Sequence, residues 1–398
     1  MPGPLAGIRV VDLTSMVSGP VATVLLADQG AEVVKIEPLA GEQMRHRHKS
    51  DIGVPPAFFS CNRGKKSLPL DLKQTAGADV LRKLIKTADV FVQNFRPGTI
   101  ERIGFGEDMV RTLQPNIVYV SISGFGEIGP HVKQRVYDPV VQAMSGLAEI
   151  QTDRATGRPH MVRTIITDKI TSVTAAQAIS SALFARERTG EGQHVRLSML
   201  DTMVAFLWPE AMAGLTYLHE ETDPAHTQQA QDLIFKTQDG YITTGAVSDS
   251  EWSGMCRALD RTDLIDDPRF LTSADRTENI AERRAIMAEE IAKWTRAEIL
   301  ERLLAADVPS APVLSRREII DNDQIVASGL IEEHDFPGIG RVRQPRPAAR
   351  FDKTPAGIQG PAPRLGEHSR EVLAELNYGD GEIEAMIDAG AVGIVGET

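Results

Sequence analysis

The stretch 8-IRVVDLTSMVSGPVATVLLADQGAEVVKIE-37 decides the fold of this chain. Its first six residues are mostly β-branched and apolar, which predicts a strand buried on both faces. A loop, Thr14 to Gly19, leads to a helix that begins at Pro20 and stops at Gly30, since proline suits a first helical turn and glycine a helix end. The run Val33 to Glu37 predicts a second strand. A strand, helix and strand in this order predict a parallel pair with a right-handed connection.

The same alternation continues through the first half of the chain, which predicts an α/β fold with a Rossmann-like, mostly parallel sheet. Expected strands cover 90–93, 117–123 and 194–197, and expected helices cover 76–88, 99–103, 108–113 and 168–186. The sequence therefore predicts a large α/β domain over 1–205, a linker over 206–225, and a smaller α+β domain over 226–325 with helices at 280–294 and 297–306. Residues 326–398 are expected to return to the large domain through a proline-rich, strand-poor segment, ending with a helix over 369–376.

Composition excludes several classes of protein. The 398 residues are 42% hydrophobic and 25% charged, as in soluble globular proteins, and 43 basic against 55 acidic residues give a net charge of −12. That charge repels phosphate backbones, so we expect no nucleic-acid partner. No apolar run approaches the roughly 18 residues of a membrane span, and no targeting signal is visible, so we expect a cytoplasmic protein without a membrane partner. Two cysteines, Cys61 and Cys256, cannot build a disulfide framework or a four-thiolate zinc site.

Among candidate site residues, Asp168 stands out because it precedes a long helix of small residues. The run Met161 to Thr167 is interpreted as a strand that enters this helix, which places Asp168 at or near the N-cap. A capping aspartate contributes about 1 kcal/mol to a helix, and on spacing alone that is the favoured role. The same position keeps a carboxylate ionised, so it could also attack an activated acyl group.

Basic residues concentrate at strand–helix junctions, where ligands of open α/β sheets bind. The runs Arg45 to Lys49 and Asn62 to Lys66, together with Arg96 and Arg102, suit either a solvated surface or a polyanionic, nucleotide-like ligand. A NAD site is not expected, because the first loop has one glycine where the dinucleotide fingerprint needs three. The sequence has no HExxH, P-loop or GxSxG motif, and no metal is expected.

Many short motifs in one order resemble the type III CoA-transferase family, which includes formyl-CoA transferase, carnitine CoA-transferases and α-methylacyl-CoA racemases. They are LAGIRVVDLT (5–14), SGP (18–20), LLADQGAEVVKIEP (25–38), NRGKKSLPLDLK (62–73), VQNFRPGTIERIGF (92–105), VYDPVVQAMSGL (136–147), TGEGQHVRLSMLD (189–201) and PRLGEHSREVL (363–373). The resemblance implies an enzyme that moves CoA from an acyl-CoA to a carboxylic acid, with CoA as substrate and product and with no metal or NAD. It also implies an interlocked homodimer.

The resemblance assigns roles to particular residues. Asp168 matches the family's nucleophilic aspartate, which would attack the acyl-CoA and carry CoA as an aspartyl thioester. The family's CoA contacts match Val17, Lys65, Asn94, Phe95, Arg102 and Arg135. A basic residue that formyl-CoA transferase uses after the second strand is Pro38 here, so its phosphate contact is expected to pass to Arg45. The glycine-rich loop of formyl-CoA transferase has no counterpart near Gly245, and neither donor nor acceptor acid can be read from the sequence.

Two alternatives remain within the resemblance. The racemases place a histidine where this chain has Tyr137, and a phenol with a pKa of about 10 is a poor base, so transfer is favoured over racemisation. Tyr137 is instead assigned to the CoA-binding residues. A non-catalytic CoA-binding protein of the same fold is the second alternative, and exchange assays separate it from an enzyme.

Overall fold

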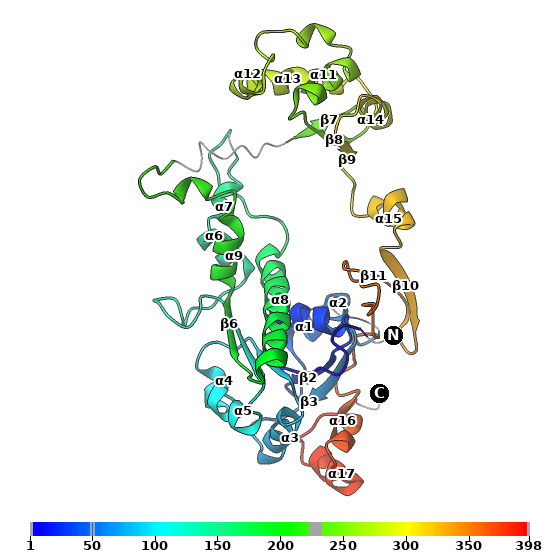
Figure 1. Cartoon of the computed structure of the whole chain (residues 1–398). Helices are drawn as coiled ribbons and strands as arrows, with labels where there is room; N and C mark the ends of the chain where they lie inside the picture. The colour runs from blue at the N-terminus through cyan, green and yellow to red at the C-terminus, as the bar shows by residue number, and fades with distance from the viewer. Residues whose placement is uncertain (1–2, 48–49, 51, 154, 223–232, 396–398) are drawn as a thin grey trace. The chain divides into compact units, whose positions relative to one another are not determined.

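The computed structural model describes residues 3–47, 50, 52–153, 155–222 and 233–395, and divides the chain into two compact units. The first unit comprises Met1–Gln228 and Leu330–Thr398, and the second comprises Gln229–Gly329. His48 and Lys49 of the basic run, and the end of the predicted linker, lie outside the described residues. Figure 1 shows the elements of both units along the chain.

The first unit is built on a six-stranded sheet in the order β3-β2-β1-β4-β5-β6, with every neighbouring pair parallel. This is the Rossmann strand order, which confirms the predicted fold class. The strands are β1 (Arg9–Asp12), β2 (Glu32–Glu37), β3 (Lys65–Pro69), β4 (Val90–Gln93), β5 (Val118–Ser123) and β6 (His194–Ser198). Successive strands leave β1 in opposite directions, so the order reverses between β1 and β4 and opens a crevice at their carboxyl ends.

Helices cover both faces of this sheet. The helices of this unit include α1 (Ser18–Ala27), α2 (Pro56–Asn62), α3 (Thr75–Ile85), α4 (Thr99–Arg102), α5 (Glu107–Leu113), α6 (Asp138–Met144), α7 (Leu147–Ile150), α8 (Ile166–Thr189), α9 (Met199–Leu207), α16 (Ser369–Glu375) and α17 (Asp380–Asp388). One face packs against α1 and α8, where Ala22 meets Ala175 and Ile179 beneath the strand valines. Small side chains let these two helices approach the sheet and each other closely.

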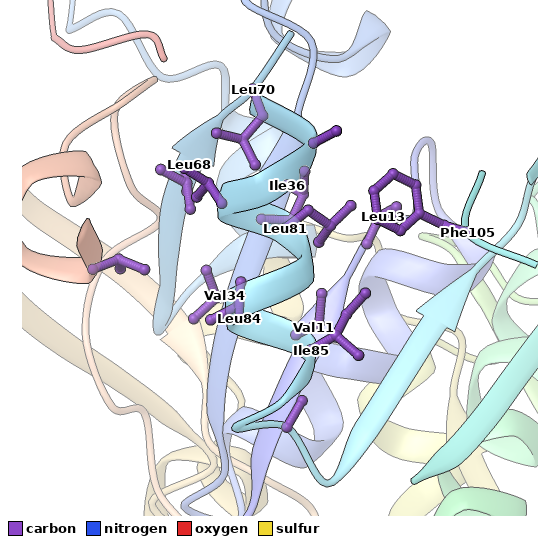
Figure 2. Packing of buried hydrophobic residues seen from close by; sticks show 14 of the residues in the cluster. Val11, Leu13, Val34, Ile36, Leu68, Leu70, Leu81, Leu84, Ile85 and Phe105 are labelled. Carbon is purple, nitrogen blue, oxygen red and sulfur yellow. The ribbon is translucent and has the colours of Figure 1, made fainter. Parts of the chain in front are cut away.

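The opposite face packs against α3, and Figure 2 shows this core from close by. Leu81, Leu84 and Ile85 of α3 lie over Val11, Leu13, Val34, Ile36 and Leu68 of the strands and their ends. All eight are at most 6% exposed. Apolar burial on both faces explains why β1, β2, β4 and β5 are rich in β-branched residues on both faces of the sheet.

Three expectations about local structure need correction. Residues 161–165 form no strand, and α8 begins at Ile166. The segment expected to be poor in strands holds an antiparallel hairpin, β10 (Ile331–Phe336) and β11 (Gly340–Pro345), whose turn contains Pro337. The helix expected over 369–376 does not end the chain's regular structure, because a further helix, α17, follows it.

The second unit has a small core of its own. A three-stranded antiparallel sheet, β7 (Ile234–Lys236), β8 (Tyr241–Thr244) and β9 (Ser310–Pro312), packs with α11 (Asp249–Ala258), α12 (Ser273–Glu278), α13 (Ile280–Ile291) and α14 (Arg296–Ala305), and α15 (Asp323–Ala327) follows. Trp252, Met255 and Ile291 are buried at its centre. Capping boxes start α11, α12 and α14, so local sequence specifies where these three helices begin.

Candidate active site

A cavity of about 250 Å³ lies at the carboxyl ends of β1 and β4 in the first unit, where the strand order reverses. The loop after β1 and the loop after β4 supply two of its walls. The lining residues are Ser15, Met16, Ser18, Gln43, Asn94, Phe95, Arg96, Pro97, Ile122, Ser123, Gly124, Phe125, Val132, Gln134, Arg135, Val136, Tyr137, Asp168 and Met199.

The two loops are joined by one side chain. Asn94 accepts a hydrogen bond from the backbone N–H of Ser15 at 2.9 Å and donates one to the carbonyl of Ser15, also at 2.9 Å. The Asn94 amide thus bonds both backbone groups of Ser15, as a neighbouring strand would, and links the two loops. Asn94 therefore fixes the cavity wall as well as lining it.

A buried charged residue holds the start of the β1 loop. Asp12, at the end of β1, accepts hydrogen bonds from the backbone N–H and the hydroxyl of Thr14 at 2.8 and 2.5 Å. Its other oxygen accepts from Thr23 of α1 at 2.7 Å and from the ammonium group of Lys65 at 2.9 Å. Burial opposes ionisation, but Lys65, the neighbouring Lys35 and the hydroxyl groups outweigh it and keep the pKa of Asp12 below its usual value.

A second buried pair holds the middle of the same loop. The ammonium group of Lys35 donates to the Thr14 carbonyl at 2.8 Å and pairs with Glu42 at 3.0 Å, and Glu42 accepts from the backbone N–H of Met16 at 2.7 Å. Met16 has a φ of 68°, a left-handed conformation that is unfavourable for a side chain of its size. The surrounding bonds over-determine this conformation, and strain of this kind is typical of functional loops.

Gly19 of the Ser-Gly-Pro motif is required by packing. A Cβ atom at this position would lie 2.3 Å from the Cβ of Thr14, far inside van der Waals contact. Glycine thus lets the first turn of α1 close against the loop it follows. The neighbouring residue, Ser18, lines the cavity beside Asp168.

Asp168 lies in the first turn of α8 as its third residue, with Ile165 at the N-cap. The cap is supplied from another element: the carboxylate of Asp138, at the start of α6, accepts from the backbone N–H and hydroxyl of Thr167 at 2.8 and 2.7 Å and from the backbone N–H of Asp168 at 3.3 Å. The capping role expected for Asp168 therefore belongs to Asp138, and the Asp168 carboxylate is free to line the cavity.

The electrostatic environment of Asp168 sets it apart from an ordinary surface carboxylate. Burial, and then the negative charge of Asp138, raise the pKa of Asp168 to about 6, although hydrogen bonding by the hydroxyl and backbone N–H of Ser18 lowers it. At pH 7 such a group is about nine-tenths ionised. It is more basic than a solvated carboxylate, and perturbed carboxylates in cavities are typical of functional sites.

The structure brings five of the predicted residues together around the cavity: Asp168, Asn94, Phe95, Arg135 and Tyr137. Tyr137 is 58% exposed at the start of α6. Val17 is 6% exposed and lies between two lining residues without lining the cavity itself. Arg102 is exposed on α4, donates to the hydroxyl of Thr99 at 2.9 Å, and is not among the lining residues.

Arg45 and Lys65 are placed differently from what the resemblance implied. Lys65 is buried, and its three N–H donors go to Asp12, Asn62 and the Pro20 carbonyl, each at 2.9 Å. Burial lowers its pKa to about 8 against the attraction of Asp12. Arg45 is buried in a bidentate pair with Glu37, donates to the Pro363 carbonyl and stacks on the ring of Phe58. Both cations serve the framework under the site rather than the cavity surface.

Several residues that build the site were missed in the sequence. Asp138 and Ser18 were quoted within motifs without a role, and Lys35 and Glu42 were not singled out. Their partners lie on other strands and helices, so no local spacing marks them. The Asp-Pro pair at the start of α6 is the one signal that could have been read, because aspartate followed by proline is typical of a helix N-terminus.

Among the described residues, no group of three or more His, Cys, Asp or Glu side chains could hold a metal ion. No helix in the same part of the chain is long and apolar enough to cross a membrane.

Comparison with known proteins identifies the class of this fold and site. Residues 5–369 match the model of CoA-transferase family III, and the chain belongs to that family. It is thus an enzyme of the type III acyl-CoA:carboxylate CoA-transferase class.

Curated relatives and solved structures agree with this assignment. The chain is 34% identical over 394 residues to the succinyl-CoA:glutarate CoA-transferase of Mus musculus, covering 98% of this chain and 90% of the relative. It is 31% identical over 408 residues to the formyl-CoA:oxalate CoA-transferase of Streptomyces coelicolor, covering 98% and 99%. A crystal structure of a CAIB/BAIF family protein from Brucella suis superposes with a TM-score of 0.83 at 29% identity, over 94% of this chain and 100% of that one.

Proposed function

We propose that this enzyme transfers CoA from an acyl-CoA to a carboxylic acid through a covalent intermediate on Asp168. The observation that carries the proposal is a half-buried carboxylate with a raised pKa, lining the cavity at the strand crossover and freed from capping by Asp138. Poor solvation makes such a carboxylate a stronger nucleophile, and at neutral pH it remains mostly ionised.

The proposed reaction has two symmetrical halves. The Asp168 carboxylate attacks the thioester carbonyl, the C–S bond breaks, and a mixed anhydride and CoA thiolate form. The thiolate then attacks the Asp168 carbonyl, releasing the donor acid and leaving an aspartyl-CoA thioester. The acceptor carboxylate reverses these steps and leaves as its CoA thioester, with Asp168 regenerated. Each step exchanges one acyl bond for another, so no redox partner is needed.

The half-buried position of Asp168 also supports this route. A mixed anhydride reacts readily with water, so the nucleophile needs a site from which water is excluded. The backbone N–H and hydroxyl of Ser18, which already hydrogen-bond the carboxylate, are the donors available to the negative charge that develops on its oxygen during thiolate attack.

We propose that Asn94, Phe95, Arg135 and Tyr137 contact the CoA thioester directly, because they line the same cavity as Asp168. Arg102 is proposed to meet a CoA phosphate outside the cavity, where its exposed guanidinium is accessible to a charged group. Val17, Lys65 and Arg45 then act by holding the strand ends and the β1 loop that form the wall.

We further propose dicarboxylic acids as the acids exchanged. The relatives named above act on succinyl-CoA and glutarate or on formyl-CoA and oxalate, which are pairs that include a dicarboxylic acid. Arg96 lines the cavity, and its guanidinium forms no ion pair with the residues that the structure describes. A second carboxylate on the substrate would supply the partner, since guanidinium and carboxylate pair in a bidentate manner.

An exchange assay tests the function. The purified enzyme is incubated with succinyl-CoA and a panel of mono- and dicarboxylic acids, and new CoA thioesters are measured by mass spectrometry. Transfer to dicarboxylic acids by the wild type, and none by Asp168→Asn, is the expected result. Binding without transfer would favour a CoA-binding protein, and deuterium wash-in at Cα without transfer would favour racemisation.

We also propose a cytoplasmic homodimer with interlocked chains. Large apolar side chains on α8 and α9 support it: Val173, Phe184 and Phe206 are 58%, 65% and 55% exposed in the single chain. Apolar surface of this kind is typical of a subunit interface. Light scattering that gives the mass of one chain at micromolar concentration would contradict the dimer.

A further inference from the structure

Four polar side chains form a continuous hydrogen-bonded relay across β4, β5 and β6. The Nδ1 atom of His194 lies 2.6 Å from Glu107 of α5, and its Nε2 atom lies 2.9 Å from the hydroxyl of Ser121. The side-chain amide of Gln93 donates to that hydroxyl at 2.8 Å, and its carbonyl accepts from the backbone N–H of Phe95 at 2.8 Å. The relay therefore ends in the wall of the active-site cavity.

The carboxylate at one end of this relay and the backbone N–H of Phe95 at the other orient the side chains between them. A carboxylate accepts only, so Nδ1 of His194 carries a proton toward Glu107, and in the neutral imidazole Nε2 is then an acceptor. The Ser121 hydroxyl donates to Nε2 and accepts from the Gln93 NH₂ group. That leaves the Gln93 carbonyl oxygen pointing toward Phe95. A side-chain amide has two orientations, and the relay selects the one that binds the Phe95 backbone.

The relay is anchored by ion pairs at its Glu107 end and is buried at its Gln93 end. Glu107 also accepts from Arg196 at 3.0 Å and from Arg111 at 3.3 Å. Burial opposes ionisation of Glu107, but His194 and these guanidinium groups outweigh it and lower its pKa. Gln93 is 5% exposed, so loss of its hydrogen-bond partners would leave a buried amide unsatisfied and would destabilise the folded state.

A second cavity, of about 560 Å³, lies on the other side of the Phe95 segment, and all four relay residues line it. Phe95, Pro97, Ile122 and Ser123 line both cavities, so the Phe95 segment is a thin partition between them. An aromatic ring on such a partition has space on either side. Its position depends on the backbone bond that Gln93 supplies.

The order Glu107, His194, Ser121 is also that of a nucleophilic triad. Ser121, however, lies inside β5, paired with Gln93 on one side and Arg196 on the other. Backbone N–H groups in such a position serve the sheet ladder, which leaves none beside the hydroxyl to stabilise an oxyanion. We propose that Ser121, Gln93 and His194 are positioning residues that hold Phe95 against the bound acyl-CoA. This rests on the proposed contact between Phe95 and CoA.

Steady-state kinetics of four variants test the proposal. Phe95→Ala is expected to raise the KM for acyl-CoA about tenfold, and Ser121→Ala about fivefold, with kcat changed less than about twofold, the pattern of lost substrate binding. Ser121→Thr keeps the hydroxyl in a strand that accepts β-branched residues, and should restore the wild-type KM. Because Ser121 acts through Phe95, the double variant should have the KM of Phe95→Ala alone.

The outcomes distinguish the positioning role of the relay from the contact between Phe95 and CoA on which that role rests. If Phe95→Ala raises KM and Ser121→Ala does not, or if their effects multiply in the double variant, the relay is refuted and the CoA contact stands. An unchanged KM in Phe95→Ala refutes the contact and the relay with it. Labelling of Ser121 by a fluorophosphonate probe would show a nucleophile and overturn the positioning role. Thermal unfolding of each variant distinguishes a local effect from a loss of folding.

Discussion

Asp168→Asn is expected to abolish transfer and at the same time to stabilise the fold at neutral pH. The folded protein holds an aspartate whose pKa is raised from 3.8 to about 6, mainly by burial and by the charge of Asp138. Asparagine is close in shape and keeps an acceptor for Ser18, but it carries no charge to repel Asp138. The variant therefore removes the unfavourable free energy of holding an ionised carboxylate in a half-buried site beside Asp138.

The magnitude follows from the pKa difference. Each pKa unit corresponds to about 1.4 kcal/mol, so a rise of roughly two units is about 3 kcal/mol, which partial exposure reduces to about 2 kcal/mol. The folded state binds the proton more tightly than the unfolded state. The wild type is thus relatively most stable below pH 4, where both states are protonated, and loses this contribution as the pH rises from about 4 to 6. Above pH 6 the difference between variant and wild type should be constant.

Chemical denaturation at pH 8 and pH 4 measures this effect. The Asn variant should exceed the wild type by about 2 kcal/mol in free energy of unfolding at pH 8 and be nearly equal to it at pH 4. Asp201→Asn is the matched control, since Asp201 holds the same position in the first turn of α9 but is exposed. It should show no such gain. An Asp168→Asn protein that is less stable than the wild type at pH 8 would refute the reasoning.

Three other predictions concern the framework and the ligand. Asp138→Ala should lower the free energy of unfolding by about 1–3 kcal/mol, because it leaves the buried N–H and hydroxyl of Thr167 without an acceptor, and urea denaturation measures this. Gly19→Ala should destabilise by about 1–3 kcal/mol through overpacking against the β1 loop, and an unchanged melting temperature would contradict the close approach. Arg102→Ala should raise the KM for acyl-CoA with little change in kcat, less so at high salt, and an unchanged KM at two ionic strengths would remove Arg102 from the site.

The sequence predicts the parallel sheet well because its strands are specified locally. Four of them, β1, β2, β4 and β5, are short runs rich in β-branched residues. The predicted strand Val90 to Gln93 matches β4 at both ends. The run from Met161 to Thr167 is just as rich in β-branched residues, yet 161–165 form no strand. Its end joins α8 because Asp138, thirty residues earlier, accepts the first N–H groups of the helix. A cap supplied from so far away leaves no local signal.

The sequence proposes candidate site residues, but it does not indicate which of them are buried in the framework. A lysine or arginine at a strand end indicates either a ligand contact or a framework ion pair, and the sequence does not distinguish them. Lys65 at the start of β3 pairs with Asp12 at the end of β1, 53 residues earlier, and β2 lies between these two strands in the sheet. Arg45 pairs with Glu37 at the end of β2, eight residues earlier. Likewise, the β10–β11 hairpin depends on strand pairing that a proline-rich composition hides.

Trapping the covalent intermediate tests the central claim most directly. The wild-type enzyme is mixed with succinyl-CoA in the absence of an acceptor acid, quenched in acid and analysed by intact-protein and peptide mass spectrometry. The account predicts a species heavier by one CoA minus one water, located on the peptide that contains Asp168 and lost on addition of glutarate. It also predicts no such species in Asp168→Asn. Full transfer activity without any adduct, or an adduct on another residue, would contradict a nucleophilic Asp168.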